Sequence, residues 1–327
     1  MNNLFPVSYS TLSSLALVGF LQDKYGLASV GCKLILRGVG DTYRVDSDRG
    51  PYILRVYRPD QRSLSQITAE VDLLLSLKER GVPVSWPIAD RSGVHIQAVG
   101  AMEGTKHLVL FSYAPGRSVS KLNDRQLHQL GFQMARFHAA AQTIELGDAR
   151  WTFDPETTLF GPLKVLQPAF AEDPEGQEWV LRIAERVNEK MAELDADSLP
   201  SGICHYDFLP KNFHFEGDGI TFFDFDFFGR GLLANDMMSF RQQLCLDTYF
   251  KRMTKEEADE AFEKFLQGYR EIRPVSDREL AIIPFLAPGW WLFYGAFHTT
   301  HDQFYPLVQP AHFKLRVDLM RKLLELA

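Results

Sequence analysis

The stretch His205-Tyr-Asp207-Phe-Leu-Pro-Lys-Asn212 decides the fold, together with Phe223-Asp224-Phe225-Asp226 downstream. Its pattern is H-x-D-x-x-x-x-N, and Asp224 follows Asn212 by 12 residues (224 − 212). Asp207 can accept a proton as a carboxylate, and Asn212 and Asp224 can offer the hard oxygen ligands that Mg²⁺ prefers. The stretch therefore predicts a site that combines a base with a divalent metal.

The neighbouring residues place this pattern on a small hairpin. Gly202–Asp207 and Ile220–Asp224 read as apolar β-type runs on either side of Gly217-Asp-Gly219, a turn signal. Three fixed residues at this spacing arise by chance on the order of a few per cent of the time in a chain of this length. Turn-forming Asp and Asn beside a buried His are the alternative. A position at strand ends favours a functional site.

The rest of the chain predicts an α+β protein with two domains, 1–112 and 113–327. In the first part, apolar periodicity predicts two helices, at 10–25 and 65–80, and five strands in an antiparallel arrangement, at 33–37, 42–46, 52–57, 94–99 and 107–113. Beyond Arg117, amphipathic patterns predict mainly helices, over 124–142, 178–194, 255–269 and 313–326. An N-terminal sheet lobe is thus expected to precede a mainly helical lobe.

Composition and charge exclude several classes of protein. The 327 residues carry 35 Lys plus Arg against 42 Asp plus Glu, a formal charge of −7, so no basic field is available for nucleic acid or an anionic membrane. The three cysteines are far apart and suit neither a zinc site nor a disulfide framework. No secretory signal is expected, and no apolar run is expected to reach the roughly 18 residues of a membrane span. The cytoplasm is the expected location.

These motifs and the order of elements resemble the aminoglycoside phosphotransferase and choline kinase group, a small-molecule branch of the protein-kinase-like fold, over nearly the whole chain. The resemblance implies a bilobal kinase that uses ATP and Mg²⁺ and phosphorylates a hydroxyl group. It also implies that Asp207 is the base or orients the hydroxyl, that Asn212 and Asp224 bind Mg²⁺, and that Asp226 assists at a second metal.

Two further residues of the motif set are expected to support the loop. By the same resemblance, His205 orders the catalytic loop, and Asp236 of Asn235-Asp236-Met237 accepts backbone N–H bonds that fix it. A solvated aspartate at a helix start is the alternative for Asp236.

Nucleotide binding is expected in the first lobe. Gly38-Val-Gly40 links two strands and would let a backbone turn approach the phosphates of a nucleotide. A hairpin turn without nucleotide binding is the alternative for these glycines. Arg55 stands where protein kinases place a lysine, with Glu70 on the next helix as its partner; an edge-strand Arg and a solvated Glu are the alternative. Phe111-Ser-Tyr113-Ala-Pro-Gly116 resembles the hinge segment of kinases, whose backbone N–H and C=O groups bind the edge of adenine.

A small acceptor is expected because only 11 residues separate Asp224 from Asp236 and no Ala-Pro-Glu motif follows. Trp290, Tyr294 and His298 share a helical face with Phe297 and His301 and can line the acceptor site, where aromatic faces could hold an ammonium group. A packed core is the alternative.

The identity of the acceptor stays open at this stage. The acidic residues between 172 and 178 suit an amine-bearing substrate or, alternatively, form a solvated loop face. Aminoglycoside, choline, ethanolamine, homoserine and fructosamine phosphorylation are all compatible with the sequence. An atypical protein Ser/Thr kinase is the alternative within the same chemistry, and a nucleotide-binding pseudokinase regulator is the alternative outside it.

Overall fold

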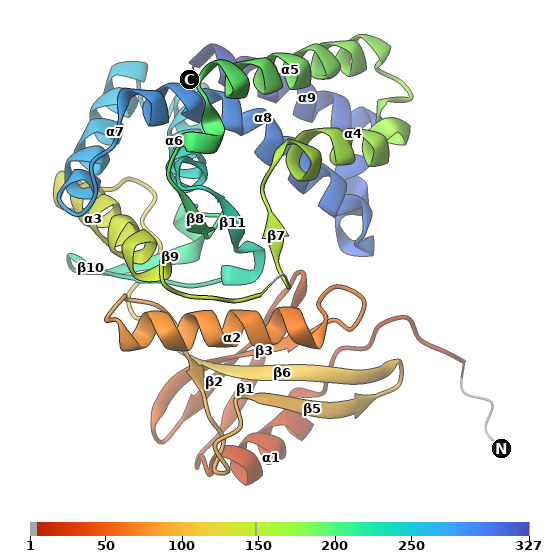
Figure 1. The fold of residues 1–327 in the computed structure, drawn as a ribbon. Helices are drawn as coiled ribbons and strands as arrows, with labels where there is room; N and C mark the ends of the chain where they lie inside the picture. Colours follow the sequence, from red (N-terminus) through yellow and green to blue (C-terminus); the bar gives the residue numbers. More distant parts are fainter. Residues whose placement is uncertain (1–4, 148, 327) are drawn as a thin grey trace. The chain divides into compact units, whose positions relative to one another are not determined.

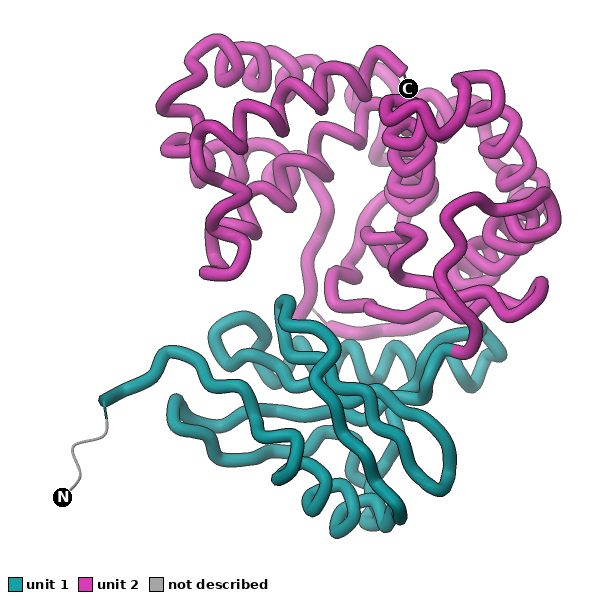
Figure 2. Tube along the Cα trace, turned by 180° about the vertical axis from the view of Figure 1, so that it is seen from behind, with its two compact units in different colours: residues 1–114 teal, residues 115–327 magenta. Residues whose placement is uncertain are grey.

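The computed structural model describes residues 5–147 and 149–326. Its chain divides into two compact units, Met1–Ala114 and Pro115–Ala327 (Figure 2). The first unit is a sheet with helices and the second is mainly helical, so the α+β class and the order of the two parts expected from the sequence are confirmed.

The first unit contains an antiparallel sheet in the order β1-β2-β3-β6-β4, with β5 paired to β6 (Figure 1). Two helices, α1 and α2, lie on opposite faces of this sheet (Figure 1). The elements are α1 (Ser14–Tyr25), β1 (Gly31–Arg37), β2 (Gly40–Ser47), β3 (Gly50–Tyr57), α2 (Leu64–Glu79), β4 (Pro87–Ile88), β5 (Ile96–Ala101) and β6 (Gly104–Ser112).

Successive side chains along each strand point to opposite faces of the sheet, so each helix packs against alternate residues. Leu54 of β3 packs with Leu21 of α1 in one apolar cluster. The next residues along β3 point to the opposite face, where Tyr57 donates a hydrogen bond to Glu70 of α2 at 3.1 Å. Helix α2 begins at a capping box in which Ser63 and Gln66 satisfy each other's backbone N–H groups.

The start of α1 differs from the expectation. The helix was expected over 10–25, but it begins at Ser14 and Ser13 is its N-cap. Ser10 instead binds Glu103, with its backbone N to Oε1 at 2.9 Å and its Oγ to Oε2 at 2.7 Å. Its end agrees with the expected range, because α1 ends at Tyr25 and Gly26 adopts the left-handed conformation with φ of 63°.

The second unit combines helices with two small sheets, β9-β10 and β7-β11-β8 (Figure 1). Its principal helices and its strands are α3 (Asp124–Ala141), β7 (Trp151–Thr152), α4 (Gly161–Leu166), α5 (Pro174–Glu193), β8 (Ser201–Cys204), β9 (Phe213–Glu216), β10 (Gly219–Phe222), β11 (Gly229–Leu232), α6 (Ala234–Tyr249), α7 (Lys255–Arg270), α8 (Asp277–Thr299) and α9 (Pro310–Leu326).

The predicted hairpin exists, but one of its strands was assigned wrongly. The strand that pairs with β10 across Gly217–Gly219 is β9, whereas β8 pairs with β11. The loop that carries His205, Asp207 and Asn212 therefore joins β8 of one sheet to β9 of the other. It connects two sheets instead of lying within one hairpin.

Helix α8 also corrects an expectation. It is long and apolar enough to cross a membrane by length and composition, contrary to the prediction that no segment would be. Within the second unit, 61% of its most apolar window is buried, and it packs against α4, α5 and α6. This burial is that of a core helix, which explains its apolar composition without a bilayer.

Candidate active site

Asp207 lies at the centre of the loop between β8 and β9 and is 3% exposed. Its Oδ2 atom receives a hydrogen bond from Asn212 Nδ2 and an ion pair from Lys211 Nζ, each at 2.8 Å. Its Oδ1 atom is buried and has no hydrogen-bond partner. Leaving such an oxygen unsatisfied costs roughly 1–3 kcal/mol, so this atom is set up to accept a proton donor that the chain does not supply.

Asn212 is held so that one of its polar atoms stays available. Its Nδ2 donates to both the carbonyl and the Oδ2 of Asp207, at 2.8 Å each. The amide oxygen is therefore the remaining group that can bind a cation. Phe223 N donates to Asn212 O at 2.9 Å, which brings the end of β10, and Asp224 just after it, beside this residue.

Asp224 and Asp226 occupy the turn that follows β10. Asp224 adopts a left-handed backbone conformation with φ of 61°, a strained choice for a residue other than glycine. Asp226 is 2% exposed in the same turn. Strain of this kind is characteristic of functional sites, and here it directs the chain out of the strand at the aspartate that the motif singles out.

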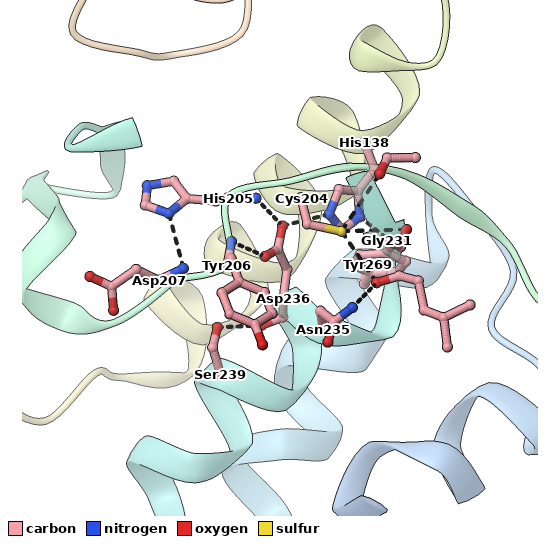
Figure 3. A network of polar contacts seen from close by, with 12 residues as sticks. His138, Cys204, His205, Tyr206, Asp207, Gly231, Asn235, Asp236, Ser239 and Tyr269 are labelled. Atoms are coloured by element: carbon pink, nitrogen blue, oxygen red, sulfur yellow. Dashed lines mark hydrogen bonds and ion pairs between the residues drawn. The ribbon is translucent and has the colours of Figure 1, made fainter. Parts of the chain in front are cut away.

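The loop is fixed from beneath by Asp236 at the start of α6 (Figure 3). This carboxylate is fully buried and accepts the backbone N–H of His205 at 2.9 Å and of Tyr206 at 2.7 Å. His138 of α3 approaches the same carboxylate at 2.9 Å through Nε2. The His205 side chain bonds to the carbonyl of Phe223 at 3.0 Å and so links the loop to the residue before Asp224.

The supporting network extends beyond the residues that the sequence singles out. Tyr269 OH lies 2.6 Å from His138 Nδ1 (Figure 3), and Arg273 Nε donates to Tyr269 OH at 3.1 Å. Arg273 also forms an ion pair with Glu279 at 2.5 Å. These residues come from α7, α8 and the segment between them, at no fixed spacing from the loop, so no sequence signal pointed to them.

The predicted aromatic residues of α8 lie against the same loop. Trp290 Nε1 donates to the carbonyl of Tyr206 at 2.9 Å. The Tyr294 ring lies 4.9 Å from the ring of Phe227, which follows Asp226. Its hydroxyl is buried without a hydrogen-bond partner. Burial, together with the nearby charges of Asp207 and the two turn aspartates, raises the pKa of Tyr294 well above its ordinary value.

His298 and His301 differ in their surroundings. His298 Nδ1 accepts a hydrogen bond from Arg316 Nη2 at 2.9 Å, and burial beside that guanidinium lowers the pKa of His298 to about 3. His301 falls beyond the end of α8, where it caps a short 3₁₀ helix over 302–308. The single helical face expected to carry both histidines therefore ends before His301.

In the first unit, the glycines expected at the nucleotide loop have different environments. A Cβ atom at Gly40 would lie 2.6 Å from the carbonyl oxygen of Val56, so the backbone of β3 requires glycine there. A Cβ atom at Gly38 would meet nothing closer than 3.8 Å. Gly40 thus has a packing role of its own, whereas a Cβ atom at Gly38 would make only ordinary van der Waals contact.

The other predicted nucleotide residues are distributed over the sheet and α2 of the first unit. Arg55 is half-buried on β3 and lies 5.8 Å from the ring of Tyr57, whereas Glu70 is 1% exposed and accepts the Tyr57 hydroxyl. Phe111 is buried in β6. Tyr113 follows that strand and has the guanidinium of Arg44 5.1 Å from its ring.

Comparison with known proteins places this arrangement in a class. The chain is 32% identical to an uncharacterized protein of Deinococcus radiodurans over 86% of this chain and 80% of that protein. It is 27% identical to a homoserine kinase of Caulobacter sp. over 86% and 84% of the two chains. The solved structure of the amicoumacin kinase hAmiN with AMP-PNP, Ca²⁺ and Ami superimposes with a TM-score of 0.73 at 20% identity, covering 96% of this chain and 94% of that chain.

The fold is therefore protein-kinase-like, and the protein is a small-molecule kinase. Residues 31–275 match the model of the Phosphotransferase enzyme family, and the chain belongs to that family. The kinase class, the fold and the ATP-dependent phosphotransfer expected from the motifs are confirmed by this match.

The residues present fit the divalent metal ion that kinases of this family use with ATP. No group of three or more His, Cys, Asp or Glu side chains that could hold a metal gathers within residues 5–147 and 149–326. That finding suits Mg²⁺, which usually takes one or two protein ligands together with water and substrate phosphates. The amide oxygen of Asn212 and the carboxylate of Asp224 are oxygen groups of the kind that would hold it.

Proposed function

We propose that Asp207 receives the proton of the acceptor hydroxyl while the γ-phosphate of ATP is transferred to the hydroxyl oxygen. The supporting observation is the buried Oδ1 atom of Asp207, which has no partner although Oδ2 has two. In the reaction, the acceptor oxygen forms a bond to the γ-phosphorus, the bond between that phosphorus and the ADP oxygen breaks, and the hydroxyl proton passes to Asp207.

Asn212 and Asp224 are the proposed metal-binding residues, with Asp226 as a second contact. Bound Mg²⁺ neutralises charge on the transferring phosphoryl group. His205 and Asp236 hold the loop backbone, so that Asp207 keeps its position without having to reorganise during the reaction. In the first unit, Gly38, Gly40, Arg55, Glu70, Phe111 and Tyr113 are proposed to bind the nucleotide.

Lys211 lies within the motif, but the motif pattern does not specify this residue. Its ammonium group occupies the Oδ2 side of Asp207 at 2.8 Å and leaves Oδ1 to face another partner. A positive charge at this point would also stabilise negative charge that develops on the transferring group. We propose Lys211 as a residue that positions the base.

The proposed acceptor is a small polar molecule, and the proposed location of the reaction is the cytoplasm, where ATP and Mg²⁺ are available. An amine on the acceptor was suggested by the acidic residues at 172–178. In the structure Asp173 caps α5 and Glu175 lies in its first turn. Carboxylates at these positions stabilise a helix N-terminus, so they give the amine no further support.

The test is an ATP-consumption screen over small hydroxyl compounds in the presence of Mg²⁺, with identification of the phosphorylated product. Asp207→Asn should lower kcat by about 10²- to 10⁴-fold, the usual contribution of a positioned general base. Asp218→Asn is the matched control, because Asp218 lies on the exposed turn of the β9-β10 hairpin. Equal loss in both variants, or no loss in either, would contradict the assignment.

The same screen distinguishes the other two functions that the sequence allows. An atypical protein kinase would label protein substrates in place of the small alcohols. A pseudokinase regulator would bind nucleotide and turn over none of the acceptors. The buried, unpartnered Oδ1 of Asp207 favours turnover, because a protein that only binds nucleotide has no use for an unsatisfied carboxylate oxygen in its interior.

A further inference from the structure

Arg316 of α9 is a half-buried cation without a carboxylate partner. It belongs to none of the ion pairs formed within the described part of the chain, and its Nη1 atom is buried with no hydrogen-bond acceptor. Burial lowers the pKa of Arg316 to about 10, so the guanidinium remains charged at neutral pH. In a chain with a formal charge of −7, a half-buried cation without a counter-charge is unusual, because removing it from water costs free energy unless an anion is bound.

Arg316 fixes the chemical state of its neighbour His298. A guanidinium can only donate hydrogen bonds, so His298 Nδ1, 2.9 Å from Arg316 Nη2, must accept. The imidazole is then neutral and carries its proton on Nε2, which agrees with its lowered pKa. The pair consequently offers hydrogen-bond donors and a positive charge, and offers no acceptor for an ammonium group.

Tyr294 connects this pair with the catalytic loop. It lies one helical turn before His298 on α8, and the two rings are 6.4 Å apart. Its ring faces that of Tyr206 in the catalytic loop at 6.4 Å, and its buried hydroxyl has no partner. The side chains along this face of α8 therefore run from the aspartates at one end to a cation at the other.

We infer that the acceptor is a hydroxyl-bearing carboxylic acid, whose carboxylate binds at Arg316 and His298 while its hydroxyl lies at Asp207. This inference rests on the proposed kinase function. His298 lies one turn of α8 after Tyr294, and Tyr294 stacks on Tyr206 next to Asp207, so an acceptor along this face would meet Arg316 and His298 at one end and Asp207 at the other. A carboxylate fits better than an ammonium, which Arg316 would repel, and its single charge matches the single cation.

The experiment uses pairs of acceptors that differ only in the charge of one group. Hydroxy acids and hydroxy amino acids are compared with their primary amides and with choline, ethanolamine and aminoglycosides, in the ATP-consumption assay with Mg²⁺. We expect turnover of a carboxylate acceptor and at least about tenfold lower kcat/KM for its amide. Such a loss is the size expected when a hydrogen bond to a charged group disappears.

Variants at position 316 test whether the preference for the carboxylate over its amide depends on the Arg316 side chain. Arg316→Gln should raise KM for the carboxylate acceptor by about 10- to 100-fold, leave KM for Mg-ATP unchanged and remove the preference over the amide. Arg316→Lys keeps the charge and should recover part of the affinity. Lys314→Gln removes one positive charge from an exposed position of the same helix and should change none of these values.

Binding of a carboxylate to the protein can also be measured directly, independently of any effect of the variants on turnover. Carboxylate binding to the full chain with Mg²⁺ and AMP-PNP is measured by calorimetry, and Arg316→Lys replaces Arg316→Gln if the latter does not fold. Binding that depends on Arg316 without phosphorylation would support the anion site and refute the proposed function. Turnover of amine or neutral acceptors with no effect of Arg316→Gln would refute the carboxylate site and leave the kinase function standing.

Discussion

Asp236 shows how a single buried carboxylate can determine the shape of a loop. It is fully buried and binds two consecutive backbone N–H groups and one imidazole (Figure 3). Three hydrogen bonds to one anion stabilise it in a position where an isolated charge would be costly. The loop that carries Asp207 therefore depends on a residue that is itself fully buried.

Asp236→Asn tests this dependence. The amide has one acceptor oxygen in place of two, so at least one of the N–H groups of His205 and Tyr206 loses its partner. We expect a loss of about 1–3 kcal/mol in the free energy of unfolding and at least a tenfold drop in kcat, with a smaller change in KM for Mg-ATP. Denaturant unfolding and steady-state kinetics measure both. A variant with normal kcat would show that the loop holds its shape without Asp236.

Glu103 gives a prediction about pH in the first unit. Lys106 is fully buried and pairs with Glu103 at 2.9 Å, and Ser10 donates two further hydrogen bonds to the same carboxylate. Burial raises the pKa of Glu103, but the bonds from Lys106 and Ser10 outweigh it and lower the pKa to about 2. Since this value lies below the ordinary 4.5, the carboxylate stabilises the fold above pH 4.5 and loses that contribution as the pH falls toward 2.

Glu103→Gln should consequently destabilise the protein by about 3–5 kcal/mol at pH 7, because the buried Lys106 loses its carboxylate partner and retains the neutral carbonyl of Ser10. The difference from wild type should shrink as the pH is lowered from 4.5 toward 2. Thermal unfolding across this pH range measures it. A difference independent of pH would mean that the carboxylate charge contributes nothing to stability.

At the same residue scale, the sequence predicted the local motif and missed the distant partners. Asp207 and Asn212 were found because a five-residue spacing can be recognised in the letters alone. Tyr269 and Arg316 were not found, because they contact His138 and His298 from other helices only after folding. No periodicity or spacing connects such residues with the loop.

Among the elements, α3 and α7 approach each other unusually closely. A Cβ atom at Gly131 of α3 would lie 1.9 Å from the carbonyl oxygen of Phe265, and a Cβ atom at Gly268 of α7 would lie 2.0 Å from that of His128. Glycines on both helices thus permit a backbone-to-backbone contact. Helix α3 supplies His138 to the Asp236 network, so the crossing also positions the catalytic loop.

Gly131→Ala should force the two helices apart. We expect a loss of at least about 2 kcal/mol in the free energy of unfolding, in the upper part of the range for overpacking, and a lower kcat from the displaced His138. Gly19→Ala in α1 is the control, because a Cβ atom there would meet nothing within 4 Å and alanine favours a helix. Equal stability of the two variants would contradict the close crossing.

Helical periodicity predicted most of the helices to within a few residues, and the catalytic hairpin shows where the sequence fell short. The pairing of β8 with β11 could not be predicted, because the strands are separated by the whole hairpin and Gly229–Leu232 has no alternating pattern of its own. Strand β9 was missed since its four residues read as part of the motif loop. Short strands carry too few residues for periodicity to decide.

At the scale of the whole chain, composition argued against nucleic-acid-binding proteins, and the motif set indicated a small-molecule kinase. The formal charge of −7 argued against nucleic acid, and the kinase class inferred from the motifs agrees with the family match over residues 31–275. The acceptor could not be predicted in the same way. In our proposal its recognition depends on side chains of α8 and α9 that meet only in the folded chain, as Arg316 and His298 do.

The most direct measurement is the rate of phosphate transfer from ATP to a small hydroxyl acceptor by the full chain with Mg²⁺, compared with Asp207→Asn and Asp218→Asn. Our account predicts a phosphorylated product, a fall in kcat of about 10²- to 10⁴-fold for Asp207→Asn and normal activity for Asp218→Asn. Transfer that continues at the wild-type rate in Asp207→Asn would contradict the central role assigned to that carboxylate.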